Sequence, residues 1–135
     1  MDGTALHAIE IAGRQLEACW AGLSLSGWDA TPLPNILSPR QLAEHLCDCY
    51  RAAIAALKGE SHDWGTYRLS DGGDPLEAWR RERAAAIEAI RTGDPEKAPH
   101  VGLEYLALHD AYHVGQLCAV RLALDPEWDA YSIYR

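Results

Sequence analysis

The chain has 135 residues, of which 48% are hydrophobic and 24% are charged, and this balance excludes a disordered protein. A chain of this length forms one domain around a single core, so residues 1–135 are predicted to be one unit. Its 12 basic and 20 acidic side chains give a formal net charge of −8, which repels phosphate backbones, so we expect no nucleic-acid partner.

Four segments repeat apolar residues at the 3.6-residue period of amphipathic helices. These helices are predicted over residues 3–24, 38–59, 74–93 and 101–124. The second and third begin with a capping residue followed by proline, as Ser38-Pro39 and Asp74-Pro75, which is a typical helix start. Four helices of about twenty residues can enclose one bundle core.

The connections after the first and second predicted helices indicate the topology. Each is about fourteen residues long, whereas simple up-down bundles use links of about two to eight residues. Loops of that length can cross the bundle, so we predict an all-α four-helix bundle with long crossover connections. Residues 63–69 are expected to form a short extended segment. The aromatic tail with Trp128, Tyr131 and Tyr134 is expected to pack across the bundle or onto a second subunit.

All four cysteines lie within predicted helices, namely Cys19, Cys47, Cys49 and Cys118. Disulfide frameworks usually occupy the loops of small secreted domains, so reduced and mostly buried thiols are expected here. The N-terminus has no basic segment followed by an apolar one, and no apolar run approaches the ~20 residues of a membrane span. These features predict a cytoplasmic protein with no membrane partner.

Three histidines interrupt the apolar faces of the second and fourth helices: His45, His109 and His113. A buried imidazole without a partner costs about 1–3 kcal/mol, so three of them need a compensating interaction. His109 and His113 are four residues apart, which places both rings on one helix face. This H-x-x-x-H spacing is one that holds divalent metals, and His45 can supply a third ligand from the facing helix.

Other readings of the same residues remain open. An i,i+4 pair is a weak signal in a chain with 6 histidines, and hydrogen bonds to Tyr105 and Tyr112 would satisfy two buried rings without a metal. Tyr105, Tyr112 and Gln116 share the face of the pair, so they either line a pocket or pack ordinarily. Cys49 is either a fourth ligand or a small buried thiol.

For most of the remaining charged side chains and histidines, exposure on a helix face or in a loop is expected. Asp48 and Asp110 either hold the second N–H of an imidazole or are exposed acids on a helix face. Residues 80–83, Arg-Arg-Glu-Arg, are predicted to form a solvated face with internal ion pairs. The other histidines, which lie near a helix start or in loops, are expected at the surface: His7, His62 and His100.

The chain resembles the DinB/YfiT-like superfamily over nearly its whole length. The matching residues are His45 in SPRQLAEHL, His109 and His113 in LHDAYHVGQL, and the Arg121 that follows. The resemblance implies a four-helix bundle with crossover topology, one histidine ligand from the second helix and two from the last long helix. It also implies one divalent transition metal (nickel, zinc, manganese or iron) and a homodimer.

Characterised members of the superfamily that the chain resembles include thiol-dependent S-transferases and isomerases, as well as metal-dependent hydrolases. We therefore expect a metal-dependent enzyme that activates water or a low-molecular-weight thiol for attack on a small electrophilic substrate. Tyr105, Tyr112 and Gln116 would orient that substrate. The alternative is a non-enzymatic stress-response or binding bundle with a structural metal or no metal.

Overall fold

The computed structural model describes residues 3–135, and its regular structure in that range is entirely helical. The predicted all-α class is confirmed, whereas residues 63–69 form no strand in this described range. The long helices are α1 (Gly3–Trp20), α3 (Pro39–Lys58), α4 (Pro75–Thr92) and α6 (Leu108–Leu124). Shorter elements are α2 (Leu25–Trp28), α5 (Ala98–Val101), the π-helical η1 (Gly102–Ala107) and the 3-10 helix η2 (Ala130–Tyr134).

The start and end signals of α3 act as the sequence predicts. The Ser38 hydroxyl accepts from the Gln41 amide at 3.2 Å, and the Gln41 side chain accepts from the Ser38 amide at 3.0 Å. This reciprocal pair satisfies two backbone donors that the first turn would otherwise leave free. Gly59 ends the helix in the left-handed conformation, with φ of 71°, which glycine adopts without strain.

The first helix ends earlier than predicted, at Trp20 rather than near residue 24. Gly22 has φ of 71°, and a left-handed residue cannot continue a right-handed helix. Ser24 then caps the short α2, because its hydroxyl accepts from the Gly27 amide at 3.0 Å. The apolar period therefore runs past the point where backbone conformation ends the helix.

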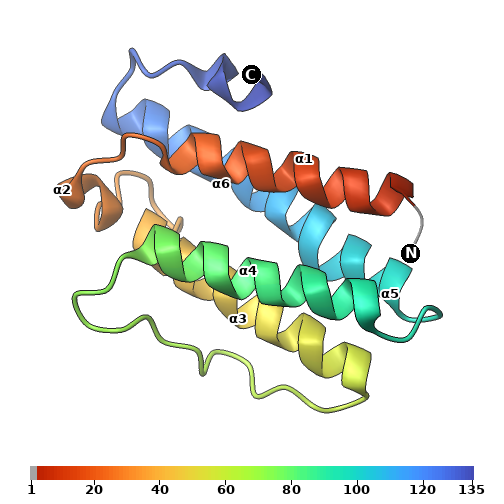
Figure 1. The fold of residues 1–135 in the computed structure, drawn as a ribbon. Coiled ribbons are helices and arrows are strands. Elements are labelled where there is room, and N and C mark those ends of the chain that lie inside the picture. The colour runs from red at the N-terminus through yellow and green to blue at the C-terminus, as the bar shows by residue number, and fades with distance from the viewer. Residues whose placement is uncertain (1–2) are drawn as a thin grey trace.

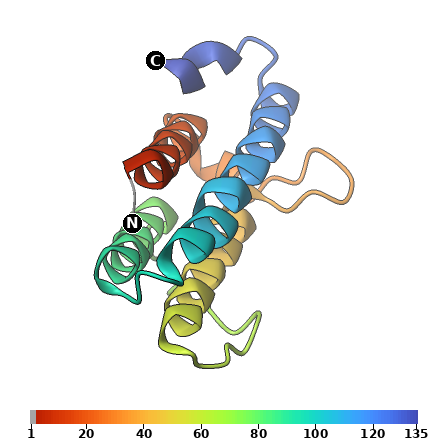
Figure 2. The same ribbon diagram turned by 90° about the vertical axis from the view of Figure 1, so that its right-hand side faces the viewer.

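Of the two long connections, the one between α3 and α4 crosses over along the bundle. This segment, residues 59–74, runs back along the bundle, so that α3 and α4 point in the same direction (Figure 1). The helices α1 and α6 run in the opposite direction. α3 packs mainly against α4, and α1 packs mainly against η1 and α6. In the end-on view of Figure 2, α1 and α4 lie on one side of the bundle and α3 and α6 on the other.

The core contains a polar cluster around Asp110 and Arg83. Asp110 is fully buried and accepts from the Tyr50 hydroxyl at 2.7 Å. Its other oxygen accepts from Nε and Nη2 of Arg83 at 3.2 and 3.1 Å, while Arg83 Nη2 also donates to the Ile9 carbonyl at 2.6 Å. Burial raises the pKa of Asp110 to about 6, and the Arg83 guanidinium opposes that rise. The prediction of a solvated face at Arg83 is wrong, and Asp110 is neither an exposed acid nor a partner of an imidazole, because the two charges satisfy each other inside the bundle.

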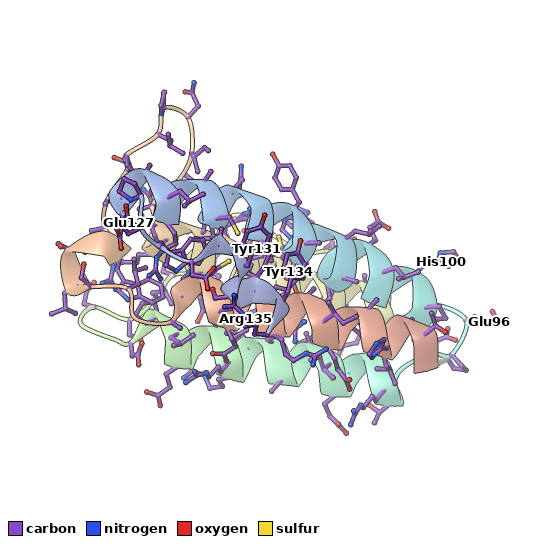
Figure 3. The ribbon with its side chains drawn as sticks, turned by 90° about the horizontal axis from the view of Figure 1, so that it is seen from above. Glu96, His100, Glu127, Tyr131, Tyr134 and Arg135 are labelled. Carbon is purple, nitrogen blue, oxygen red and sulfur yellow. The ribbon has the colours of Figure 1, made fainter. Side chains whose placement is uncertain are left out.

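The aromatic tail is only partly packed. Trp128 is half-buried, with the Arg121 guanidinium 5.1 Å from its ring. η2 lies along α1, and Figure 3 shows Tyr131 and Tyr134 on the surface there, where they are 71% and 72% exposed. Within residues 3–135, no helix has the length and apolar character needed to cross a membrane.

Candidate metal centre

The structure brings the three predicted histidines together between α3 and α6. Nε2 of His109 lies 3.2 Å from Nε2 of His45 and 3.0 Å from Nε2 of His113. The three rings are inclined to one another by 68° to 89°. The donor atoms of all three lie within 4.8 Å of one another. One nitrogen from each ring therefore points at a common centre.

Hydrogen bonds within the cluster cannot account for this convergence. A ring nitrogen carries either one proton or one lone pair, so Nε2 of His109 can take part in only one N–H···N bond. It nevertheless faces the Nε2 atoms of both His45 and His113. At least one close nitrogen pair is left uncompensated, and a cation between the lone pairs removes that conflict.

The nitrogen spacing fits a divalent ion. Zinc–nitrogen bonds of about 2.0–2.1 Å at tetrahedral angles place ligand nitrogens roughly 3.3–3.4 Å apart. The two contacts at His109 are 3.2 and 3.0 Å, so an opening of a few tenths of an ångström suffices. Three imidazoles are also a donor set that suits the late first-row metals.

Burial keeps the three imidazoles in the neutral form that a metal requires. Loss of solvation lowers the pKa of His109 to about 4, with further lowering by His113 and His45. Burial also lowers the pKa of His45, against an opposing effect of Asp48, and that of His113, against its hydrogen bond to Gln116. A neutral ring has a lone pair to offer at pH 7.

Gln116 fixes the orientation of one ligand. Nδ1 of His113 donates to its Oε1 at 2.7 Å, which leaves the lone pair on Nε2, facing the other two rings. Nδ1 of His109 is buried and has no hydrogen-bond partner in residues 3–135. The orientation of His109 therefore depends on what its Nε2 binds.

Cys49 does not complete a four-ligand set. Its Sγ lies 3.9 Å from the Nε2 atoms of His45 and His109, but the group with mutually close donor atoms comprises the three histidines alone in the part of the chain described. Zinc–sulfur bonds of about 2.3 Å would place sulfur roughly 3.5–3.6 Å from each nitrogen. Without a metal, burial raises the pKa of Cys49 to about 12. The other cysteines are likewise free.

The predicted tyrosines lie beside the site without hydrogen-bonding its histidines. Tyr112 is 63% exposed, and its ring meets the His113 ring edge-on at 5.0 Å. Its hydroxyl accepts from the Gln116 amide at 3.5 Å. Tyr105 is half-buried and stacks with Trp64, with ring centroids 6.4 Å apart. The two tyrosines therefore do not satisfy the buried imidazoles, which was the alternative to a metal.

Sequence reasoning missed the loop beside the site. Asp48, 4% exposed, is neither a solvated acid nor a partner of the three histidines. Its carboxylate accepts from the Gly65 amide at 2.9 Å and the Tyr67 amide at 3.2 Å, and it contacts Nε2 of His62 at 3.2 Å. His62 is half-buried, whereas His7 and His100 are exposed, the latter at one end of the bundle (Figure 3). The loop has no apolar period that could have indicated this packing.

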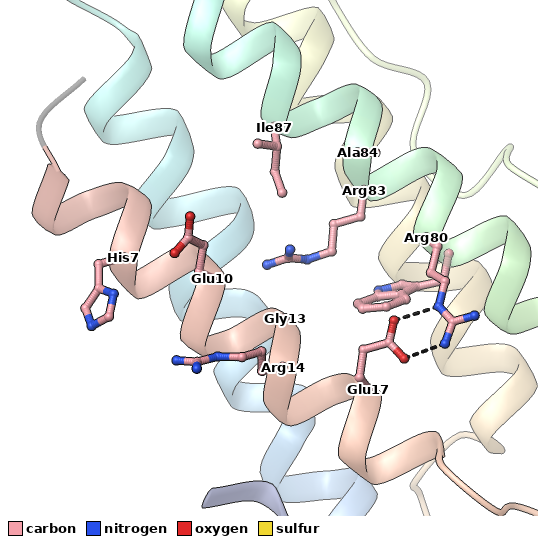
Figure 4. A pocket seen from close by; sticks show the side chains of 10 residues that line it. His7, Glu10, Gly13, Arg14, Glu17, Arg80, Arg83, Ala84 and Ile87 are labelled. Atoms are coloured by element: carbon pink, nitrogen blue, oxygen red, sulfur yellow. Dashed lines mark hydrogen bonds and ion pairs between the residues drawn. The ribbon is translucent and has the colours of Figure 1, made fainter. Parts of the chain in front are cut away.

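Of two cavities in the bundle, one borders a histidine of the candidate site and the other does not. A pocket of about 280 Å³ borders His45 and is also lined by Gln41, Glu44, Gly65 and Arg68. A larger groove of about 510 Å³ lies between α1 and α4. Figure 4 shows Arg83 pointing into that groove, and an ion pair at its rim. The larger groove includes none of the three histidines, whereas the smaller pocket includes one of them, His45.

Comparisons with known protein families and with curated proteins give no match to this chain. The case for a metal site therefore depends on the geometry of the three histidines.

Proposed function

We propose that this protein is a metal-dependent enzyme of the DinB/YfiT-like superfamily, in which His45, His109 and His113 hold one divalent transition-metal ion. The observation that carries the proposal is the meeting of three Nε2 atoms from α3 and α6, two of the contacts being 3.2 and 3.0 Å. Two features support the family assignment. One histidine comes from the second long helix and two come from the last, and the chain crosses over at residues 59–74.

The proposed reaction is attack of water or of a low-molecular-weight thiol on a small electrophile. A divalent ion at such a site lowers the pKa of a bound water or thiol toward neutrality and so supplies a nucleophile at physiological pH. The chain contributes three neutral donors and leaves the remaining position to water or substrate. Gln116 holds His113 with Nε2 directed inward, and the pocket of about 280 Å³ beside His45 has room for a small molecule.

A structural metal in a closed site is the competing function. Structural zinc sites are almost always four-coordinate, with all four ligands from protein. Cys49 is the nearest additional donor, and its Sγ lies 3.9 Å from two of the histidines. A three-ligand set therefore favours a catalytic site over a structural one.

Metal analysis of matched variants tests the proposal. The wild-type protein, incubated with zinc and desalted, is expected to retain one ion per chain. His109→Ala should lose at least roughly 100-fold in zinc affinity, whereas His100→Ala, at an exposed position, should bind as the wild type does. Cys49→Ser should also keep its zinc.

Two outcomes would contradict the proposal. Unchanged zinc binding by His109→Ala would refute the three-histidine site. Loss of zinc from Cys49→Ser would establish a closed four-ligand site and a structural role. Turnover is then sought with reactive esters and epoxides, with and without added thiol, and must disappear in His109→Ala.

A further inference from the structure

Trp64 is a solvent-exposed indole that is nevertheless held in place. It is 57% exposed, yet the His62 ring meets it edge-on at 5.0 Å and 89°. On another side it lies nearly parallel to the Tyr105 ring, at 6.4 Å and 11°. Large apolar side chains that are ordered but exposed are typical of ligand-binding surfaces.

The loop that carries Trp64 is fastened to the helix that carries His45. Asp48 holds the loop on both sides of Trp64, because its carboxylate accepts from the Gly65 amide at 2.9 Å and contacts His62 Nε2 at 3.2 Å. Asp48 lies one helical turn after His45 on α3. The position of the indole is therefore set relative to the metal ligands.

Further exposed apolar groups extend this surface along α6. Leu108 and Tyr112 are 68% and 63% exposed, and they flank His109 in the sequence. Tyr105 precedes His109 by four residues. Isolated exposed apolar residues need no explanation, but a group of them beside a set of converging donors marks a binding surface.

We infer that Trp64 and Tyr105 form a stacking platform for the substrate of the proposed metal centre, and that this substrate carries a flat apolar group, such as an aryl ring, next to its electrophilic atom. The inference rests on the proposed function and names the substrate class of the same site. Gly65, the residue after Trp64, lines the pocket that borders His45, and Tyr105 lies about one helical turn before His109, so the platform adjoins two of the proposed ligands.

The size of that pocket argues for a small molecule rather than a second copy of the chain. Its volume of about 280 Å³ is close to the lower end of small-molecule sites, which span roughly 300–1,000 Å³. Gln41, Glu44 and Arg68 add polar groups to its lining.

A matched pair of metal-binding probes tests the platform without requiring turnover. Benzohydroxamate and acetohydroxamate share the group that chelates a divalent ion and differ in an aryl ring against a methyl group. For the zinc-loaded protein, calorimetry should give roughly tenfold tighter binding of benzohydroxamate. Trp64→Ala should remove most of that preference and leave acetohydroxamate affinity and zinc content unchanged. Trp64→Phe should retain the preference for benzohydroxamate. Tyr131→Ala, a control at an exposed aromatic residue of the tail, should retain it as well.

The outcomes separate this inference from the proposed function. Equal affinity for the two probes, or a preference that survives in Trp64→Ala, overturns the platform while leaving the metal centre intact. A sedimentation coefficient that falls in Trp64→Ala while the probe preference is unchanged shows that a second copy covers the indole, which also overturns it. Failure of the wild type to bind zinc refutes the metal centre and the platform with it.

Discussion

Replacement of Arg83 by methionine should destabilise the protein far more than the same change at Arg80. Both arginines lie on α4, and each donates two hydrogen bonds to one carboxylate. They differ in burial: the Arg83 and Asp110 side chains are 9% and 0% exposed, whereas those of Arg80 and Glu17 are 56% and 38% exposed. The pair of substitutions compares a buried ion pair with an exposed one of similar geometry, and Arg83 additionally loses its bond to the Ile9 carbonyl.

The expected difference follows from the charge left behind. Arg83→Met removes both donors to Asp110 Oδ2 and leaves a carboxylate inside the bundle, which costs about 3–5 kcal/mol. Arg80→Met breaks an exposed pair that is worth about 0–1 kcal/mol. The free energy of unfolding of a small domain falls by about 1.5–2 kcal/mol per molar urea. A variant that loses about 4 kcal/mol of this free energy therefore unfolds at a urea concentration roughly 2 M or more lower than the wild type.

The pH dependence provides a second measurement on the same variants. Burial already raises the pKa of Asp110 to about 6, and Arg83 opposes that rise, so removal of Arg83 raises the pKa further. Below this raised pKa the carboxyl takes up a proton and the uncompensated charge disappears. The free energy of unfolding that Arg83→Met loses relative to the wild type should therefore be largest near pH 8 and become smaller near pH 5.

Urea unfolding followed by circular dichroism measures both effects. The double variant Arg83→Met/Asp110→Asn should lose less stability than the sum of the two single variants, by about 2 kcal/mol, because no isolated charge remains in it. The reasoning is refuted if Arg83→Met costs no more than Arg80→Met, or if its deficit grows as the pH falls.

Two further predictions concern the packing of α1 and the metal centre. A Cβ at Gly13 would lie 2.5 Å from Arg83 Nη1, whereas one at Gly115 would meet nothing within 4 Å. In thermal unfolding, Gly13→Ala should therefore lower the free energy of unfolding by about 1–3 kcal/mol. Gly115→Ala should raise it by up to about 1 kcal/mol, because alanine favours the helix more than glycine does. Equal effects would show that Arg83 moves aside freely. Because burial lowers the pKa of all three histidines, that of His109 to about 4, zinc affinity should stay nearly constant from pH 8 to 6.5 in competition titrations and fall below about pH 5.5. A tenfold loss already at pH 6.5 would contradict this.

The sequence predicted the helices well where local chemistry determines them. The caps at Ser38 and Asp74 and the left-handed Gly59 act through neighbouring residues, so their signals lie within a few positions of one another. The three histidines were predictable for a related reason. The pair on α6 has a fixed spacing, and an imidazole in an apolar row of α3 indicated the third.

Long-range packing was not predictable in the same way. Arg83 lies in a run of charged residues, and nothing nearby in the sequence indicates that Asp110, 27 positions away, would accompany it into the core. Trp64 and His62 lie in a loop without a period, and their place depends on Asp48 of another element. Such contacts arise from topology, which pairs segments that the sequence keeps far apart.

The parallel course of α3 and α4 links the folding of the chain to the surface beside its histidines. A helix of 20 residues is about 30 Å long, and the chain must travel that distance back before α4 can begin. The return segment, residues 59–74, is also the one that carries Trp64 (Figure 1). Fully extended, a segment of this length could span about 53–58 Å, so a deletion of a few residues would still reach α4 but would pull the loop away from the Asp48 carboxylate that holds it. Changes of side chain in this segment therefore leave the backbone path of the return intact, whereas shortening it displaces the loop beside the histidines.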